Sequence, residues 1–153
     1  EVAVTVGENQ VKFVINNVTV ISRLIEGNFP PYEKIIPATF SAHISINREE
    51  MILAVKRISL FAQTGTHNLF LELEKGELTV SGEMQEIGKD QSKIAGQSEG
   101  ELKKITFNAN HLLAALEHIP DDELTLNVNS DTSPGMLQGK DKNYVNIIMP
   151  RKI

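Results

Sequence analysis

The sequence contains no cysteine and no tryptophan, and aromatic residues make up only 5% of its 153 positions. Without cysteine, the chain forms neither disulfides nor thiolate metal sites, and a reducing compartment is favoured. No apolar run approaches the roughly 18 residues that a membrane-spanning helix needs, and no secretory signal opens the chain. These absences predict a protein without a disulfide framework or a membrane partner.

Recognisable catalytic patterns are also missing. The four histidines lack metal-ligand spacing such as HExxH, and the sequence has neither a P-loop nor GxGxxG. The acidic pairs Glu49-Glu50 and Asp121-Asp122 fall where predicted helices begin and end, where carboxylates are common for structural reasons. The sequence therefore predicts a protein without a catalytic site, a metal or a cofactor.

The overall charge gives a weaker indication. The formal net charge is -5, which argues against general affinity for nucleic acid but leaves room for a local basic face. With 41% hydrophobic and 23% charged residues, the chain suits one compact domain, or one domain plus a fragment.

What the sequence does contain is a repeated order of elements. Alternating β-branched residues first predict strands over 2–6 and 11–21, with a candidate turn at Asn16-Asn17. A strand over Phe40–Ile46 then leads to Asn47, which is expected to cap a helix from about Arg48 to Gln63.

The same order returns later in the chain. A strand over Lys103–Phe107 leads to Asn108, which is expected to cap a helix that ends near Ile119. The strands predicted after the two helices are Leu69–Leu73, Leu78–Val80, Met84–Ile87, Leu124–Val128, Met136–Gln138 and Tyr144–Met149, with Gly88–Gly100 as a loop or weak edge strand. This duplicated β-α-β-β-β unit predicts an α+β fold in which two helices pack on one face of mainly antiparallel sheet.

The first predicted helix has two different faces. Its apolar face should pack on the sheet and holds Met51, Val55, Ile58 and Ala62. On the opposite face, Leu60, with Phe61 beside it, is either one of the single exposed apolar residues common in proteins or a contact with another chain. Lys56 and Arg57 on that face are either solvated or directed at phosphates.

The stretch Arg23–Pro37, RLIEGNFPPYEKIIP, differs from the rest of the chain. Consecutive prolines exclude a helix or a central strand, so the segment should be extended and stiff, close to polyproline in form. Such composition is typical of an interdomain connector. Because many of its side chains are apolar, we expect it to lie on a surface and bury something.

Two motifs give the chain a family resemblance. The stretch fits the pattern R-L-[IV]-[DE]-G-x-[FY]-P-x-Y-x-x-[IV]-[IL]-P, and the chain ends in an apolar strand followed by Met149-Pro150-Arg151-Lys152-Ile153. In this it resembles the bacterial DNA polymerase III β subunits, the sliding clamps, which have three similar domains per chain. The resemblance implies terminal strands of the middle domain in 1–28, a connector in 29–37 and the third domain in 38–153.

The resemblance also implies a function. Sliding clamps are non-catalytic processivity factors of the cytoplasm, in which two chains close into a homodimeric ring around duplex DNA without reading its sequence. Replicative polymerase, clamp loader and repair polymerases dock into a groove through short peptide motifs. The matching groove positions are Pro30, Lys34, Ile35, Thr66, Asn108, His111, Thr132, Ile147, Ile148, Met149, Pro150, Arg151, Lys152 and Ile153.

Two further surfaces follow from the resemblance. Leu60 and Phe61 match the apolar pair that packs against the other subunit, and Lys56 and Arg57 are the candidates for the DNA-facing side of the ring. Thr66 and His111 depart from the family, since relatives often carry aromatic residues there. The alternative function is a stand-alone peptide-binding scaffold of the same fold that does not encircle DNA, and the number of domain copies in the full gene product separates the two.

Overall fold

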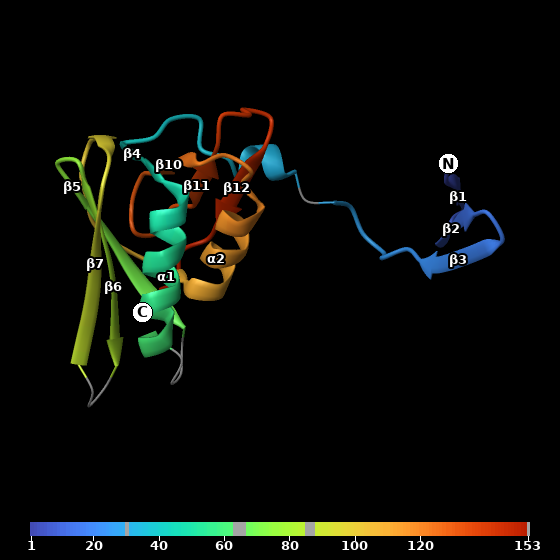
Figure 1. The fold of residues 1–153 in the computed structure, drawn as a ribbon. Coiled ribbons are helices and arrows are strands. Elements are labelled where there is room, and N and C mark those ends of the chain that lie inside the picture. The colour runs from blue at the N-terminus through green and yellow to red at the C-terminus, as the bar shows by residue number, and fades with distance from the viewer. Residues whose placement is uncertain (30, 63–66, 85–87, 153) are drawn as a thin grey trace. The chain divides into compact units, whose positions relative to one another are not determined.

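The computed structural model describes residues 1–29, 31–62, 67–84 and 88–152. By the contacts within the chain, it divides into two compact units, Glu1–Tyr32 and Glu33–Ile153. All strand pairs in both units are antiparallel in the part of the chain that the structure describes. The second unit contains the two α-helices (Figure 1).

The first unit is a small antiparallel sheet in the order β1-β2-β3. Its strands are β1 (Ala3–Val6), β2 (Gln10–Ile15) and β3 (Val18–Arg23). Asn16 lies between β2 and β3 with a φ of 52°, a left-handed conformation that asparagine tolerates in tight turns. The turn predicted at Asn16-Asn17 is therefore confirmed.

Most apolar side chains of this sheet are exposed. Val6 is 68% exposed and Ile21 is 61% exposed, although both belong to residue types that are usually buried. The same holds for Val4, Ile15, Val18 and Val20. A sheet of β-branched residues with this much uncovered apolar surface needs a second layer for independent stability.

The stretch after β3 differs in part from its prediction. Pro30 lies outside the described residues, but directly after Pro31 the chain forms a short 3-10 turn, η1 (Tyr32–Lys34), instead of continuing extended. A proline fixes φ near -65°, which also suits the start of a helical turn. Most apolar side chains of the stretch are exposed in this chain, Ile25 and Phe29 largely so, whereas Leu24 and Ile36 are half-buried.

The second unit confirms the predicted duplication. The first repeat consists of β4 (Ala42–Asn47), α1 (Arg48–Ala62), β5 (Asn68–Glu74), β6 (Glu77–Met84) and β7 (Gly88–Ala95). A short strand, β8 (Gln97–Glu99), follows. The second repeat consists of β9 (Leu102–Asn108), α2 (Ala109–His118), β10 (Glu123–Val128), β11 (Gly135–Gln138) and β12 (Val145–Ile148).

The two repeats exchange their first strands. One sheet has the order β12-β11-β10-β4-β8 and the other has the order β7-β6-β5-β9. Strand β4 of the first repeat thus pairs with β10 of the second, and β9 of the second repeat pairs with β5 of the first. Each sheet therefore contains strands from both repeats, an arrangement that the sequence pattern did not reveal.

Both helices begin at the predicted caps. The Asn47 side-chain oxygen accepts a hydrogen bond from the Glu50 amide at 3.0 Å. The Asn108 side-chain oxygen accepts hydrogen bonds from the amides of Asn110 and His111, at 2.9 and 3.3 Å. These bonds satisfy amides that have no partner within the first turn of a helix.

The helices lie side by side and cover the sheets, with α1 against β5, β6 and β7, and α2 against β9 and β12 (Figure 1). Met51, Val55 and Ile58 on the predicted apolar face of α1 are fully buried, while the side chain of Ala62 lies outside the description. Between helices and sheets, a single apolar core includes residues of both repeats. The predicted α+β arrangement is confirmed, and its antiparallel strands are divided between two sheets.

Of the two alternatives predicted for Gly88–Gly100, the edge strand is confirmed and the loop is wrong. The segment forms β7, which pairs with β6 from Met84↔Gly88 to Glu77↔Ala95, and then β8 in the other sheet. Its polar composition is explained by its position at a sheet edge, where side chains are solvated. Gly96 lies between β7 and β8, where the chain passes from one sheet to the other. Only glycine fits at this position, because a Cβ would collide with the Ser45 carbonyl oxygen and the Ile44 and Ile46 side chains.

Candidate functional site

The C-terminal segment lies across the end of the second unit. Strand β12 pairs with β11, so that Ile148 lies opposite Gly135. Beyond β12, the Arg151 amide donates a hydrogen bond of 2.8 Å to the carbonyl oxygen of Thr106 in β9. The segment after Ile148 is therefore held between both sheets, next to the start of α2.

This bond brings together several of the predicted groove residues. Thr106 precedes Asn108 by two residues in the same strand, so this bond places the backbone of Arg151 near the cap of α2. The side chain of His111, in the first turn of α2, is exposed. In the tail itself, Met149 is 59% exposed, Ile147 and Pro150 are half-buried, and Ile148 is buried. Exposed apolar surface on a backbone held at both ends suits an apolar segment of a partner.

Thr132 lies in the turn between β10 and β11, at the same end of the sheet as Ile148. The Ser130 hydroxyl accepts hydrogen bonds from the amides of Thr132 and Ser133, at 3.4 and 3.2 Å, which fixes the turn. Because Gly135 at the end of this turn is opposite Ile148, Thr132 belongs to the neighbourhood of the tail.

Asn129 connects the start of the second unit to this turn. Its side-chain oxygen accepts a hydrogen bond from the Ser41 amide at 2.7 Å, and its side-chain nitrogen donates one to the Thr39 carbonyl at 2.9 Å. The segment that begins with Lys34 and Ile35 thus runs toward the end of β10. Neither Asn129 nor the Thr106 carbonyl was foreseen, because an isolated asparagine and a backbone atom give no sequence signal.

Not every predicted groove residue can be placed. Pro30, Thr66 and Ile153 lie outside the described residues. Asn108 can be placed, but its side-chain oxygen already caps α2, as the oxygen of Asn47 caps α1. Capping therefore accounts for Asn108 without any ligand.

The outer face of α1 carries the remaining predicted positions. Leu60 is 62% exposed, and Leu53, about two helical turns earlier on the same face, is 61% exposed. The side chain of Phe61 lies outside the described residues. Lys56 forms an ion pair of 3.3 Å with Glu117 of α2. Arg57 forms one of 3.1 Å with Asp90 of β7 and also donates to the Gln91 carbonyl.

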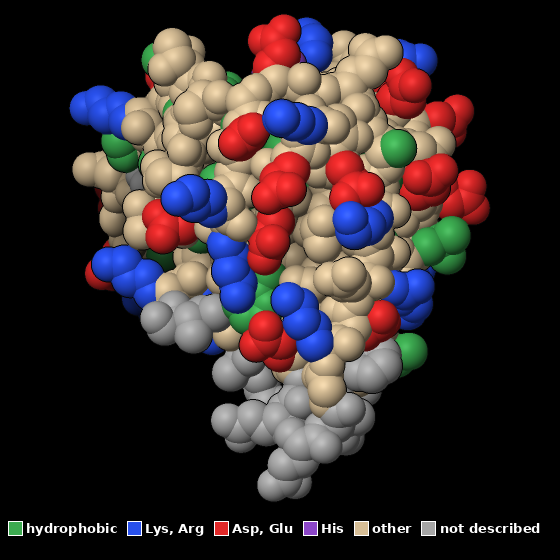
Figure 2. All heavy atoms as spheres, turned by 90° about the vertical axis from the view of Figure 1, so that its left-hand side faces the viewer, with side chains coloured by type: hydrophobic (Ala, Val, Ile, Leu, Met, Phe, Trp, Pro, Cys, Tyr) green, Lys and Arg blue, Asp and Glu red, His purple; other side chains and the backbone are tan. Residues whose placement is uncertain are grey.

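These ion pairs reduce the positive charge that Lys56 and Arg57 give to the outer face of α1. Each cation is partly neutralised by an acidic neighbour, although exposed pairs contribute only about 0–1 kcal/mol and are easily exchanged for another anion. Figure 2, which faces the side of β5, β6 and β7, shows lysine and arginine interspersed with acidic side chains. The two cations also point apart, one toward α2 and the other toward β7.

Among the described residues, no group of three or more histidine, aspartate or glutamate side chains is arranged to hold a metal ion. In the same part of the chain, no helix is long and apolar enough to cross a membrane.

Comparison with known proteins identifies the family. Residues 33–152 match the family described as DNA polymerase III beta subunit, C-terminal domain. The Beta sliding clamp of Staphylococcus aureus is 33% identical over 146 residues, which cover 93% of this chain and 38% of that protein. The Beta sliding clamp of Chlamydia pneumoniae is 25% identical over 153 residues, covering 100% of this chain and 42% of that protein.

Solved structures give the same result. The DNA polymerase sliding clamp of Bacillus subtilis aligns with a TM-score of 0.89 and 30% identity, covering 99% of this chain and 41% of that one. The DNA polymerase III beta subunit of Thermotoga maritima aligns with a TM-score of 0.89 and 27% identity, covering 99% and 42%. The chain thus spans about two fifths of the length of its relatives. By motif, fold and sequence, it belongs to the family of the DNA polymerase III beta subunit, matching that family's C-terminal domain.

Proposed function

We propose that this chain is the C-terminal part of a bacterial sliding clamp, a non-catalytic processivity factor that tethers the replicative polymerase to DNA in the cytoplasm. The observation that carries the proposal is the family match over residues 33–152. In the complete protein, two chains form a homodimeric ring around duplex DNA, and the ring holds DNA without reading its sequence.

In this proposal, residues 1–28 are the last strands of the middle domain, 29–37 form the connector and 38–153 form the third domain. The uncovered valine and isoleucine side chains of β1–β3 support this division, because they need apolar residues of another segment to cover them. The boundary between the compact units, at Tyr32 and Glu33, falls within the proposed connector.

The peptide groove lies along the C-terminal tail. The exposed Met149 side chain and the tail's hydrogen bond to Thr106 support this assignment, because a backbone held in place beforehand loses less freedom when a peptide docks. Polymerase, clamp loader and repair polymerases would use short motifs with apolar residues at this groove. The proposed positions are Pro30, Lys34, Ile35, Thr66, Asn108, His111, Thr132 and Ile147–Ile153.

The subunit interface and the DNA-facing surface lie on α1. Leu60 and Phe61 contact the other subunit, and the exposure of Leu60 supports this role. Lys56 and Arg57 face DNA phosphates. Their local ion pairs support a weak attachment, which suits a ring that slides, because each phosphate contact must displace an acidic neighbour.

The decisive experiment tests topological linkage. The full-length protein that contains this chain is loaded onto a nicked circular plasmid with its clamp loader, and the plasmid is then cut once. A ring is retained on the circle and lost from the linear DNA, since it slides off the ends. Equal retention on both forms would refute encirclement and favour the stand-alone scaffold.

Two substitutions in the full-length protein separate the proposed surfaces. Met149→Asp should abolish binding of a clamp-binding peptide in calorimetry while light scattering still shows the dimer. Leu60→Asp should give monomers that still bind the peptide. Because each variant is the control for the other, loss of both properties in either one would count against the assignment.

A further inference from the structure

Asn129 directly follows β10 and ties together two segments that lie far apart in the sequence. Its side-chain oxygen accepts a hydrogen bond of 2.7 Å from the Ser41 amide. Its side-chain nitrogen donates one of 2.9 Å to the carbonyl oxygen of Thr39. These partners precede Asn129 by 88 and 90 residues, so a single side chain holds the backbone just before β4 at two points.

The held backbone directly follows the proposed connector, residues 29–37. Residues 37–41, all of which the structure describes, form neither helix nor strand between η1 and β4. In this described stretch, every hydrogen bond that involves a side chain runs to Val128 or Asn129, since the Ser41 hydroxyl also lies 3.3 and 2.9 Å from their carbonyl oxygens. The end of β10 is therefore the polar attachment of this stretch to the sheet.

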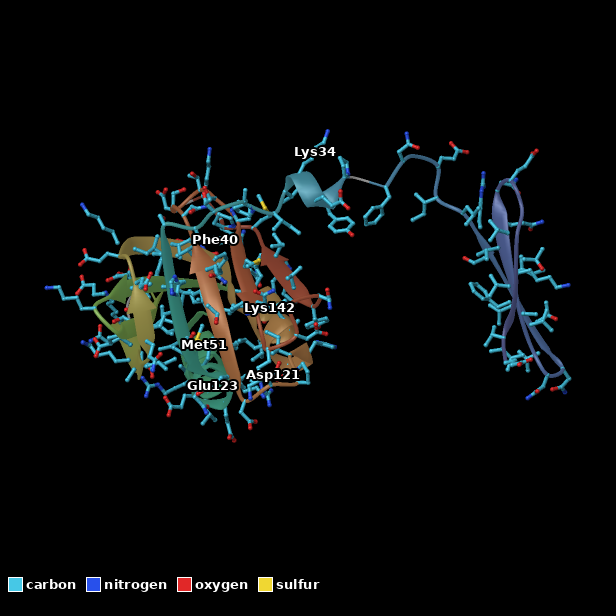
Figure 3. All side chains as sticks on the ribbon, turned by 90° about the horizontal axis from the view of Figure 1, so that it is seen from above. Lys34, Phe40, Met51, Asp121, Glu123 and Lys142 are labelled. Carbon is cyan, nitrogen blue, oxygen red and sulfur yellow. The ribbon has the colours of Figure 1, made fainter. Side chains whose placement is uncertain are left out.

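The connector and Asn129 meet at one end of the second unit. In Figure 3, Glu123, the first residue of β10, lies at the opposite end of the unit from Phe40, and Lys34 lies beyond Phe40 on the same segment of chain. Since β10 runs from Glu123 to Val128, Asn129 lies at the end where the connector arrives.

The sheet side of this attachment is rigid. Ser130, the next residue, accepts hydrogen bonds from the amides of Thr132 and Ser133, which fixes the turn between β10 and β11. The turn ends at Gly135, where a Cβ would collide with the ring of the fully buried Phe107. The same glycine pairs with β12. The turn that carries Thr132 is therefore packed against the core and against the strand that leads to the tail.

The connector side depends more on the attachment. Ile35 is 46% exposed, so burial alone does not fix it. Four residues separate Ile35 from Thr39, which limits the distance between their Cα atoms to about 14 Å. Pro37 lies between them and has its φ angle fixed by its ring, which stiffens the link further. Holding Thr39 therefore confines Ile35 to the neighbourhood of the end of β10.

We infer, on the basis of the proposed function, that Asn129 is a positioning residue of the peptide groove. It keeps the connector positions Lys34 and Ile35 at a fixed distance from the turn of Thr132. Asparagine suits this task because its short side chain offers both an acceptor and a donor, one for each backbone partner. Asn129 acts through the backbone that it holds, without contact to the peptide.

Loss of this attachment should lower the fraction of free protein whose groove is ready to bind. The apparent affinity falls in proportion to that fraction, so Kd rises about fivefold if roughly one molecule in five keeps the connector in place. A bound peptide should draw the connector back, because it favours the arrangement that binds it.

The test uses the full-length protein that contains this chain and the synthetic peptide acetyl-Gln-Leu-Ala-Leu-Phe-amide. Asn129→Ala should weaken binding at least about fivefold in calorimetry. Hydrogen exchange of residues 33–41 should be faster in the free variant and should return to the rate of the unmodified protein at saturating peptide. Unchanged affinity, unchanged exchange in the free variant, or fast exchange that peptide does not slow would each refute the positioning role.

Asn47→Ala is the matched control, because it also removes a hydrogen bond from an asparagine side chain to the backbone. Asn47 ends β4, about 17 Å from the start of that strand beside Ser41. The control should leave peptide affinity unchanged, and equal weakening by both substitutions would refute the positioning role. If Asn129→Ala does not fold, Asn129→Asp replaces it, since a carboxylate still accepts from the Ser41 amide but cannot donate to Thr39. It should still weaken binding, and full affinity would be a refutation.

Met149→Asp separates a failure of the positioning role from a failure of the proposed function. If Met149→Asp abolishes binding while Asn129→Ala keeps full affinity, the groove stands and Asn129 does not position it. If Met149→Asp binds the peptide as tightly as the unmodified protein, the proposed groove is wrong, and the role of Asn129 falls with it.

Discussion

The two units of this chain differ in where they keep their apolar residues. The second unit buries Phe107, Leu112 and Leu116 completely in a core shared by both repeats, whereas the first unit leaves Val6 and Ile21 mostly exposed. Both units have strands with good β-forming residues. Strand propensity alone therefore does not make a stable unit, and the burial of one sheet face decides which part of the chain is self-sufficient.

The largest effect should come from the core of the second unit. Phe107→Ala is expected to lower the free energy of unfolding by about 3–5 kcal/mol, because the ring is fully buried and packs against Gly135. Ile21→Ala in the first unit should change it by less than about 0.5 kcal/mol. Urea denaturation followed by helical circular dichroism, which reports on the second unit, measures both. A loss above 1 kcal/mol for the Ile21 variant would break the comparison.

A smaller effect should come from the two helix caps, one in each repeat of the second unit. Asn47→Ala and Asn108→Ala should each cost about 1 kcal/mol, because each removes the acceptor for amides of a first helical turn. The control is Asn110→Ala in the first turn of α2, where alanine favours the helix slightly. The same urea titration measures all three. Equal losses for Asn110 and Asn108 would show that capping is not the cause.

The smallest effect should come from an exposed ion pair of the second unit. It tests whether exposed side chains of this unit contribute as little to stability as those of the first unit. The Lys93 ammonium lies 2.6 Å from a Glu77 carboxylate oxygen, and this hydrogen bond, with the attraction between the charges, raises the pKa of Lys93. Because the folded-state pKa is raised, the stabilisation is complete below the ordinary lysine pKa and is lost as pH rises through the raised value.

Glu77→Gln should therefore move the pKa of Lys93 back toward its ordinary value, as followed by NMR titration of the side chain. Glu83→Gln is the control, since Glu83 lies 4.0 Å from Lys89 and does not contact Lys93. An unchanged Lys93 titration in the Glu77 variant would contradict the assigned cause.

The sequence predicted the elements well because their signals are local. Asn47 and Asn108 marked the helix starts, and the spacing of Met51, Val55 and Ile58 identified the buried face of α1. The division of the strands into two sheets was not predictable, because it depends on which distant strands pair. The edge strand β7 gave only a weak signal, because Ile94 is the one buried residue among its eight and the others are polar or small.

The candidate groove was predictable only in part. Its residues were indicated by the resemblance of two motifs, while the apolar Met149 alone would not have identified a site. The hydrogen bond from Arg151 to the Thr106 carbonyl and the anchoring by Asn129 depend on the folded arrangement and leave no pattern in the sequence. The placement of the groove is therefore a proposal, which the Met149→Asp substitution tests with Leu60→Asp as its control.

The exchange of first strands between the repeats has a consequence for synthesis. Ser45 of β4 contacts Thr125 of β10, which follows it by 80 residues, so one sheet lacks a central neighbour until β10 has left the ribosome. The other sheet similarly waits for β9. Pairings over such sequence separations give a high contact order, which is associated with slow folding. Strand β4 can pair with β8 once residues 97–99 are made, but its other edge stays unpaired until β10 follows, the period in which chaperone contact would matter most.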